Sequence, residues 1–221
     1  MIYLAEFLGS FFLVATVIGS GIMGERLSPD NTAIALLGNT IPTGAMLFVL
    51  IKMFGPISGA HFNPAVSTVF LLRKEIDLKK FLHYIFYQLL GGLFAVIVIH
   101  FIFNNPPNYS LEIFQISKHA PRSDEWALLV SEIIATAGLI LTILFVRNSD
   151  SDSVAASVAL FITAGYWFTS STSFANPAVT IARVFTNTFT GISPQSIIYF
   201  ISGQIIGSFI GLKIFQLSNK K

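Results

Sequence analysis

The sequence predicts an all-α membrane protein in which six transmembrane helices and two re-entrant half-helices form an inverted repeat. Three observations favour this fold class: an apolar composition, six apolar segments of membrane-spanning length, and three motifs that occur in the same order in each half. Of the 221 residues, 53% are hydrophobic and only 11% are charged. A soluble domain would carry about 25% charged residues. The chain therefore belongs in a lipid bilayer.

Six apolar segments have the length of about 20 residues that a transmembrane helix needs. They are 2–23, 33–54, 81–103, 126–146, 154–172 and 195–215. Segment 2–23 has no basic leader and no cleavage signal behind it, so we interpret it as a mature helix rather than a signal peptide.

Two further apolar pieces, 64–72 and 177–185, are too short to cross a membrane. Each has nine residues, which is roughly 13 Å of helix. Short apolar pieces in matching places of two halves are typical of re-entrant half-helices that line a cavity inside the protein.

Three motifs recur in the two halves of the chain. The pairs are AEFLG around Glu6 and SEIIA around Glu132, the Asn-Pro-Ala triplets at Asn63 and Asn176, and YQLLGG around Gln88 and GQIIGS around Gln204. Each half holds three crossings, an odd number, so the second copy enters the bilayer upside down. We predict one channel domain, 1–221, made of a first repeat 1–103, an extracellular connector 104–125 and a second repeat 126–217.

The basic residues predict the orientation of the chain in the cell membrane. With both termini cytoplasmic, eight basic residues lie inside and three outside, which satisfies the positive-inside rule. Those inside are Arg73, Lys74, Lys79, Lys80, Arg147, Lys213, Lys220 and Lys221, and those outside are Arg26, Lys118 and Arg122.

Composition and motifs also exclude several classes of function. A net charge of +2 without a basic run argues against a nucleic-acid partner. No nucleophile, acid/base pair or nucleotide-binding loop appears, so we do not expect an enzyme. The absence of Cys and of a His/Asp/Glu spacing leaves no reason to expect a metal or another cofactor.

The two Asn-Pro-Ala triplets indicate the starts of the half-helices. They are Asn63, Pro64 and Ala65 in the first half and Asn176, Pro177 and Ala178 in the second. Asn is a favourable N-cap and Pro suits the first helical position. In an inverted repeat the two helix N-termini, with their partial positive charges, face each other near the bilayer centre. Each Asn carbonyl would cap its helix while the amide NH₂ donates to a solute, an arrangement that passes neutral molecules and opposes cations.

In these motifs the chain resembles the aquaporin family, also called major intrinsic proteins, over nearly its whole length. The resemblance rests on AEF at 5–7, SGAHFNPAV at 58–66, Gln88, Glu132, ANPAV at 175–179 and Gln204. It implies six tilted helices and two half-helices around a pore in each protomer, and assembly into a homotetramer. It also implies a selectivity filter toward the extracellular side, formed by Thr43, Ala164, Ser173 and Val179. A shift of two residues would place Tyr166 in the filter instead of Ala164.

Val179 departs from the pattern of the family, most members of which carry Arg at that position. A filter of three small residues and Val is wider and less polar than one that passes only water. Arg183 lies one helical turn, 5 to 6 Å, beyond Val179 on nearly the same face. Two interpretations stay open, a displaced ring of charge at the outer mouth, or a side chain that extends outward or binds loop carbonyls, and we favour the second.

NPAVTIAR with Val at this place looks like a bacterial subgroup of aquaglyceroporin-like channels associated with arsenic detoxification, which implies the bacterial inner membrane. We therefore expect a passive channel for small neutral solutes and water. Glycerol, arsenous acid, related metalloid hydroxides, methylated arsenicals and urea all fit this description. The alternatives are a water-selective channel, a leaky ion channel, and a transporter in which Glu6 or Glu132 carries a proton.

Three further expectations concern residues near the pore and between the helices. We favour Glu6 and Glu132 as acceptors of hydrogen bonds from the broken-helix backbone. His61 either lines the inner vestibule, where it would sense pH, or makes a structural hydrogen bond. The GxxxGxxxG spacing of the last helix allows close helix packing, for which we favour packing inside the protomer over oligomer contact; its glycines are Gly203, Gly207 and Gly211.

Overall fold

The computed structural model describes residues 1–103, 114–121 and 123–219, and within these residues the fold is all-helical. The α-helices are α1 (Ile2–Leu27), α2 (Thr32–Ser58), α3 (Pro64–Leu72), α4 (Leu78–Ile102), α5 (Glu125–Ser149), α6 (Val154–Phe168), α7 (Pro177–Val184) and α8 (Ile197–Ser218). Two short 3₁₀ turns, η1 (Ser151–Ser153) and η2 (Pro194–Ser196), precede α6 and α8. The all-α membrane fold predicted from the sequence is confirmed.

Five helices in the described part of the chain, α1, α2, α4, α5 and α8 with η2, are long and apolar enough to cross a membrane. The helix of the remaining predicted crossing, α6, is shorter than expected, with 15 residues ending at Phe168 rather than at Thr172. It ends there because Thr169 is extended, with φ −120° and ψ 142°, and begins the loop that leads to α7. α6 packs beside α2 and α5 within the bundle.

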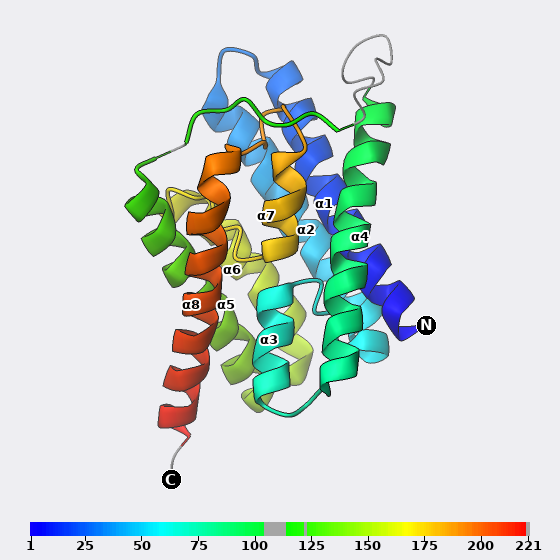
Figure 1. Ribbon diagram of the computed structural model, residues 1–221, viewed down its shortest axis with the longest axis vertical. Helices are drawn as coiled ribbons and strands as arrows, with labels where there is room; N and C mark the ends of the chain where they lie inside the picture. The colour runs from blue at the N-terminus through cyan, green and yellow to red at the C-terminus, as the bar shows by residue number, and fades with distance from the viewer. Residues whose placement is uncertain (104–113, 122, 220–221) are drawn as a thin grey trace.

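The helices α1–α4 and α5–α8 follow the same plan in opposite senses. Figure 1 shows α1 and α5 running in opposite directions, with α3 and α7 beginning near the middle of the bundle and running toward opposite ends. α1 packs on α2 and α4, and α5 packs in the same way on α6 and α8. Each half-helix contacts both α4 and α8, so the last helix of each repeat supports both half-helices.

Part of the predicted connector 104–125 lies outside the described residues, namely 104–113 and 122. The segment that follows runs along the chain just beyond α7: Gln115 N donates to Phe185 O at 3.0 Å, and Ser117 N donates to Val184 O at 2.8 Å. The predicted boundaries of the two repeats stay a prediction. The paired segments cover the end of α7 that points away from the bundle centre (Figure 1).

Glycines allow the first and last helices of each half to approach closely. A Cβ built on Gly91 of α4 would collide with Phe7 O of α1, and one on Gly207 of α8 would lie 2.6 Å from Ile133 O of α5. Gly203 and Gly211 face the α5 backbone in the same way, at 2.6 Å from Leu129 O and 2.8 Å from Ala137 O. The GxxxGxxxG stripe therefore packs inside the protomer, as we favoured.

A small ion network ties the loop after α3 to the end of α5. Glu75 accepts from Arg73 Nε and from Arg147 Nη1, each at 2.6 Å. Arg147 also lies over the Phe70 ring, 5.1 Å from its centroid. Burial alone would raise the pKa of Glu75, but the hydrogen bonds from Arg147 and Arg73 lower this pKa below its ordinary value of 4.5. The network therefore stabilises the folded chain when Glu75 is ionised.

We expect the stabilisation by Glu75 to disappear on acidification. A carboxyl group whose pKa is lower in the folded state than in the unfolded state stabilises the fold fully at a pH above its unfolded-state pKa. This stabilisation is lost as the pH falls through the folded-state pKa. In detergent, the melting temperature of the native chain should exceed that of Glu75→Gln at pH 7. The difference should vanish once the pH is below the folded-state pKa of Glu75. The effect is small, under about 1 kcal/mol per ion pair, because both partners are partly exposed. Glu25→Gln, on an exposed carboxylate, is the control.

Candidate pore and selectivity site

The two half-helices begin at Asn caps of the same geometry. Asn63 and Asn176 have extended backbones, with φ of −155° and −154°. Asn63 Oδ1 accepts from Ala65 N at 2.8 Å, and Asn176 Oδ1 accepts from Ala178 N at 3.0 Å. A Pro follows each Asn at the first helical position, where no backbone donor is needed.

The amide groups of these Asn residues also join the two halves, which the sequence did not predict. Asn63 Nδ2 donates to Ala175 O at 2.6 Å, and Asn176 Nδ2 donates to Phe62 O at 2.8 Å. An amide NH₂ carries two hydrogens. The expectation that the whole NH₂ group faces a solute is therefore corrected, since one hydrogen of each Asn holds the opposite loop and one is left for the pore.

The loops that precede the half-helices contain residues in the left-handed backbone region at matching places. Ala60 and Phe62 have φ of 51° and 48°, and Ser173 and Ala175 have φ of 52° and 47°. Each such residue costs of order 1–3 kcal/mol unless its surroundings stabilise it. These loops therefore need support from elsewhere in the fold.

Glu6 and Glu132, neither of which is exposed to solvent, provide that support. Each carboxylate accepts four hydrogen bonds, from a Ser hydroxyl, two loop N–H groups and a Gln amide. For Glu6 these come from Ser58 at 2.6 Å, His61 N at 3.0 Å, Phe62 N at 2.7 Å and Gln88 at 2.7 Å. For Glu132 they come from Ser171 at 2.5 Å, Phe174 N at 3.0 Å, Ala175 N at 2.8 Å and Gln204 at 2.6 Å. The geometry favours the structural role over a proton relay.

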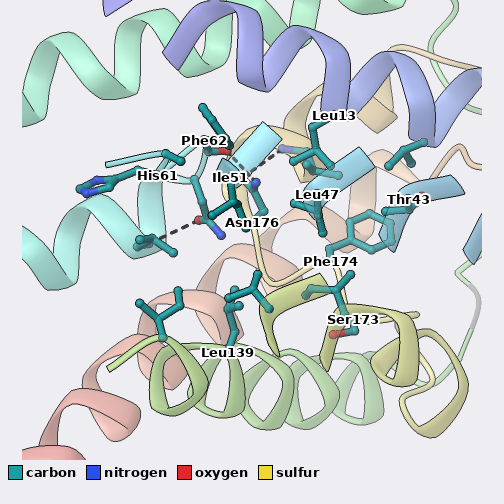
Figure 2. Close-up of a pocket in the computed structure, with 18 of the residues that line it drawn as sticks. Leu13, Thr43, Leu47, Ile51, His61, Phe62, Leu139, Ser173, Phe174 and Asn176 are labelled. Carbon is teal, nitrogen blue, oxygen red and sulfur yellow. Dashed lines mark hydrogen bonds between the residues drawn. The ribbon is translucent and has the colours of Figure 1, made fainter. Parts of the chain in front are cut away.

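A cavity of about 100 Å³ runs beside the two Asn residues. Figure 2 shows Thr43 and Ser173 toward one end, His61 toward the other, and Asn176 between them. Aliphatic side chains make up much of the wall and come from α1, α2, α5 and α6: Leu13, Val17, Leu47, Ile51, Leu139, Ile143, Val158 and Ile162. None of these wall residues was predicted from the sequence. A narrow space with an apolar wall and a few polar groups suits small, uncharged molecules.

Three of the four predicted filter positions line this cavity, namely Thr43, Ser173 and Val179. The fourth prediction, Ala164, is wrong. Ala164 is exposed on the outer face of α6, whereas Tyr166 is buried and lines the cavity. Two residues along an α-helix turn the side chain by about 200°, so the two positions face opposite sides. Tyr166 Oη donates to Thr43 Oγ1 at 3.3 Å across the cavity end.

Ser173 lines the cavity from a tightly packed position. Within the described residues its Oγ has no hydrogen-bond partner, and the residue is only 1% exposed. A Cβ on Gly165 would lie 2.6 Å from the Cβ of Ser173. Because Gly165 has no side chain, Ser173 can pack against α6 at this point and stay away from the pore axis. This contact between residues 165 and 173 could not be predicted from the sequence.

His61 combines the two roles that the sequence left open. Its Nδ1 lies 3.0 Å from Ser67 Oγ, and its ring lines the cavity. Ser67 Oγ accepts from Gln88 Nε2 at 3.1 Å, so its own hydrogen is available for His61 Nδ1. The response of His61 to pH stays a prediction.

Arg183 does not extend outward, since it is only 2% exposed. Its Nε donates to Thr190 O at 2.5 Å, which is the loop-carbonyl contact that we favoured. Its guanidinium carbon lies 3.6 Å from the centroid of the Phe174 ring, and the residue lines the cavity.

Comparisons with known proteins agree with this geometry. Residues 2–169 match the family Major intrinsic protein. The chain is 43% identical to "Aquaglyceroporin AqpS" of Rhizobium meliloti (strain 1021), over 96% of this chain and 87% of that protein. It is 30% identical to "Aquaporin NIP2-2" of Zea mays, over 96% of this chain and 69% of that protein. The "X-ray structure of the aquaglyceroporin from Plasmodium falciparum" shares the fold, with a TM-score of 0.72 and 23% identity over 99% of this chain and 95% of that chain.

The fold, the paired half-helices and these matches define a membrane channel for water and small solutes. The chain belongs to the major intrinsic protein family. Members of this family are passive channels and not enzymes.

Proposed function

We propose that this protein is a passive channel for small, neutral, hydroxylated solutes together with water. Glycerol, arsenous acid and related metalloid hydroxides or methylated arsenicals make up the proposed solute class. The observation that carries the proposal is the lining of the cavity, to which the apolar Val179 belongs together with Thr43, Tyr166 and Ser173. The name of the relative from Rhizobium meliloti, an aquaglyceroporin, supports the same solute class.

The chemistry of the filter matches the chemistry of a polyol or metalloid hydroxide. Such molecules present several hydroxyl groups on a small frame, and a hydroxyl both donates and accepts hydrogen bonds. Thr43, Tyr166 and Ser173, which all carry a hydroxyl group, line the cavity. The apolar wall at Val179 suits the carbon or metalloid face of the same solute. Water alone would not need such a wall.

Tyr166 favours a second candidate, a water-selective channel, because its ring takes space that a small residue would leave open. The Thr43–Tyr166 hydrogen bond at 3.3 Å spans the same end of the cavity. We still favour the wider solute class, because residue 179 lacks the guanidinium that narrows a water filter. A proton-coupled transporter is disfavoured because both buried carboxylates accept four hydrogen bonds from the loops and neighbouring helices.

We expect Val179→Arg to suppress the uptake of glycerol and arsenous acid roughly tenfold or more while water still passes, because a guanidinium fills the apolar wall. Stopped-flow light scattering on proteoliposomes measures these rates with and without a proton gradient. The native chain should take up the larger solutes at the same rate under both conditions. Uptake of water alone by the native chain would favour the water-selective alternative, and dependence on the gradient would favour a transporter.

Two control variants test the filter assignment in the same assay. Val179→Leu keeps the wall apolar and should retain most of the uptake. Ala164→Val changes the exposed face of α6 and should leave every rate unchanged. An effect of Ala164→Val equal to that of Val179→Arg would contradict the filter assignment.

We propose that the channel is a homotetramer in the bacterial inner membrane with both termini in the cytoplasm. The family resemblance supports the tetramer, and the distribution of basic residues supports the orientation. The two termini point toward the same end of the bundle in Figure 1, as this orientation requires.

A further inference from the structure

Arg183 lies one turn beyond Val179 on the wall of the same cavity. Both residues belong to α7 and both line the cavity. Four residues along a helix give nearly the same face and about 6 Å of rise. Figure 1 shows that α7 runs from the middle of the bundle toward the end where the connector lies. The backbone of Arg183 therefore lies between the filter level and the outer mouth.

Rigid groups on two sides hold the guanidinium of Arg183. Its Nε donates to Thr190 O at 2.5 Å, and its guanidinium carbon lies 3.6 Å from the centroid of the Phe174 ring. Phe174 is itself held, because its backbone N donates to the buried carboxylate of Glu132 at 3.0 Å. The charge thus has a defined position rather than the mobility of a surface side chain.

The helix that carries Arg183 also favours a positive charge at this place. Arg183 is in the last turn of α7, where the partial negative charge of the helix C-terminus stabilises a cation. A guanidinium keeps its charge at every physiological pH. With 2% of the residue exposed, its field is little screened by bulk solvent along the adjoining pore. A cation that enters from the outer mouth meets this field before it reaches Val179.

We propose that Arg183 is the specificity-determining cation of this pore, and that it supplies the charge barrier at a level one turn outside the filter. The barrier against cations is thereby separated from the steric filter. The level of residue 179 stays open to larger neutral solutes, while the level of residue 183 excludes Na⁺ and other cations. This inference rests on the proposed function, since it explains how a pore with an apolar filter wall passes hydroxylated solutes without a leak of ions.

The test compares ion leak and glycerol uptake in proteoliposomes of the native chain and of Arg183→Gln. We expect a roughly tenfold rise in Na⁺ leak for the variant, with glycerol uptake at least equal to that of the native chain. Arg183→Lys keeps the charge and should keep the leak low. Size-exclusion chromatography shows whether each variant is folded. A folded Arg183→Gln channel that passes glycerol and stays tight to Na⁺ would overturn the inference.

A charge-swap variant decides the case in which Arg183→Gln does not fold. Val179→Arg combined with Arg183→Val moves the guanidinium one turn inward. It should keep the Na⁺ leak at the native level and reduce glycerol uptake, whereas a high leak would overturn the inference. A further measurement needs only the native chain, namely the reversal potential across a NaCl gradient. A native pore that is permeable to Na⁺ would also overturn the inference about Arg183. Failure of the native chain to take up glycerol would instead count against the proposed function.

Discussion

Glu132→Ala is expected to abolish solute uptake and to leave little folded channel in the membrane. The carboxylate accepts four hydrogen bonds, from Ser171, Phe174 N, Ala175 N and Gln204. Removal of the acceptor leaves buried donors unsatisfied, at about 1–3 kcal/mol for each. Ser173 and Ala175, whose φ values of 52° and 47° are unfavourable for residues with a Cβ, lose their support at the same time. The loop that positions Asn176 and the filter should therefore collapse.

The yield of monodisperse protein after extraction and the rate of glycerol uptake measure this effect together. Glu6→Ala should behave in the same way, because Glu6 holds the other loop through four hydrogen bonds from the same three kinds of donor. Glu25→Ala removes an exposed carboxylate and serves as the matched control, with native yield and uptake expected. A folded Glu132→Ala channel with native uptake would show that the loop supports itself.

Gly91→Ala and Gly207→Ala are expected to destabilise the protomer strongly, each in its own half. The added methyl group would collide with Phe7 O in the first case and would lie 2.6 Å from Ile133 O in the second. Backbone carbonyls cannot move aside as a flexible side chain can, so α1 and α4, or α5 and α8, must separate. Overpacking of this kind costs about 1–3 kcal/mol, and occasionally more. We expect a clear fall in melting temperature in detergent for each variant.

Gly38→Ala is the matched control for these substitutions. Gly38 also lies within a transmembrane helix, but the nearest atom to an added Cβ is 3.8 Å away, an ordinary contact distance. Because alanine also has the better helix propensity, this variant should melt at or above the native temperature. Equal destabilisation by all three substitutions would show that the cost arises from the helices themselves and not from their close approach.

The two Asn-Pro starts of the half-helices, at the centre of the site, could be predicted from short stretches of the sequence. An Asn cap and the Pro that follows it are adjacent in the chain, so their geometry depends on few other residues. Glu6 and Glu132 could be assigned to the loops that precede the half-helices, because each half contains one such Glu and one such loop in the same order. The same regularity predicted an all-α inverted repeat before any contact was known.

The lining of the filter shows where sequence reasoning fails. The choice between Ala164 and Tyr166 depends on the rotation of α6 about its axis, which the length of the following loop determines. That loop begins at Thr169, earlier than the apolar pattern indicated, because the chain must reach the left-handed residues 172, 173 and 175. A hydrophobic stretch indicates that a helix lies in the membrane, but it does not indicate which face of the helix points toward the cavity. The role of Gly165 depends on its contact with Ser173, which only the tertiary structure brings about.

By itself the sequence determined the membrane class, the inverted repeat, the capped half-helices and the apolar residue at position 179, because each of these depends on composition or on residues close together in the chain. The tertiary structure alone decided that Tyr166 lines the pore, that the amides of Asn63 and Asn176 join the opposite loops, and that Arg183 lies against Phe174 beside the cavity. These contacts unite residues from different helices, and their geometry depends on the packing of the whole bundle.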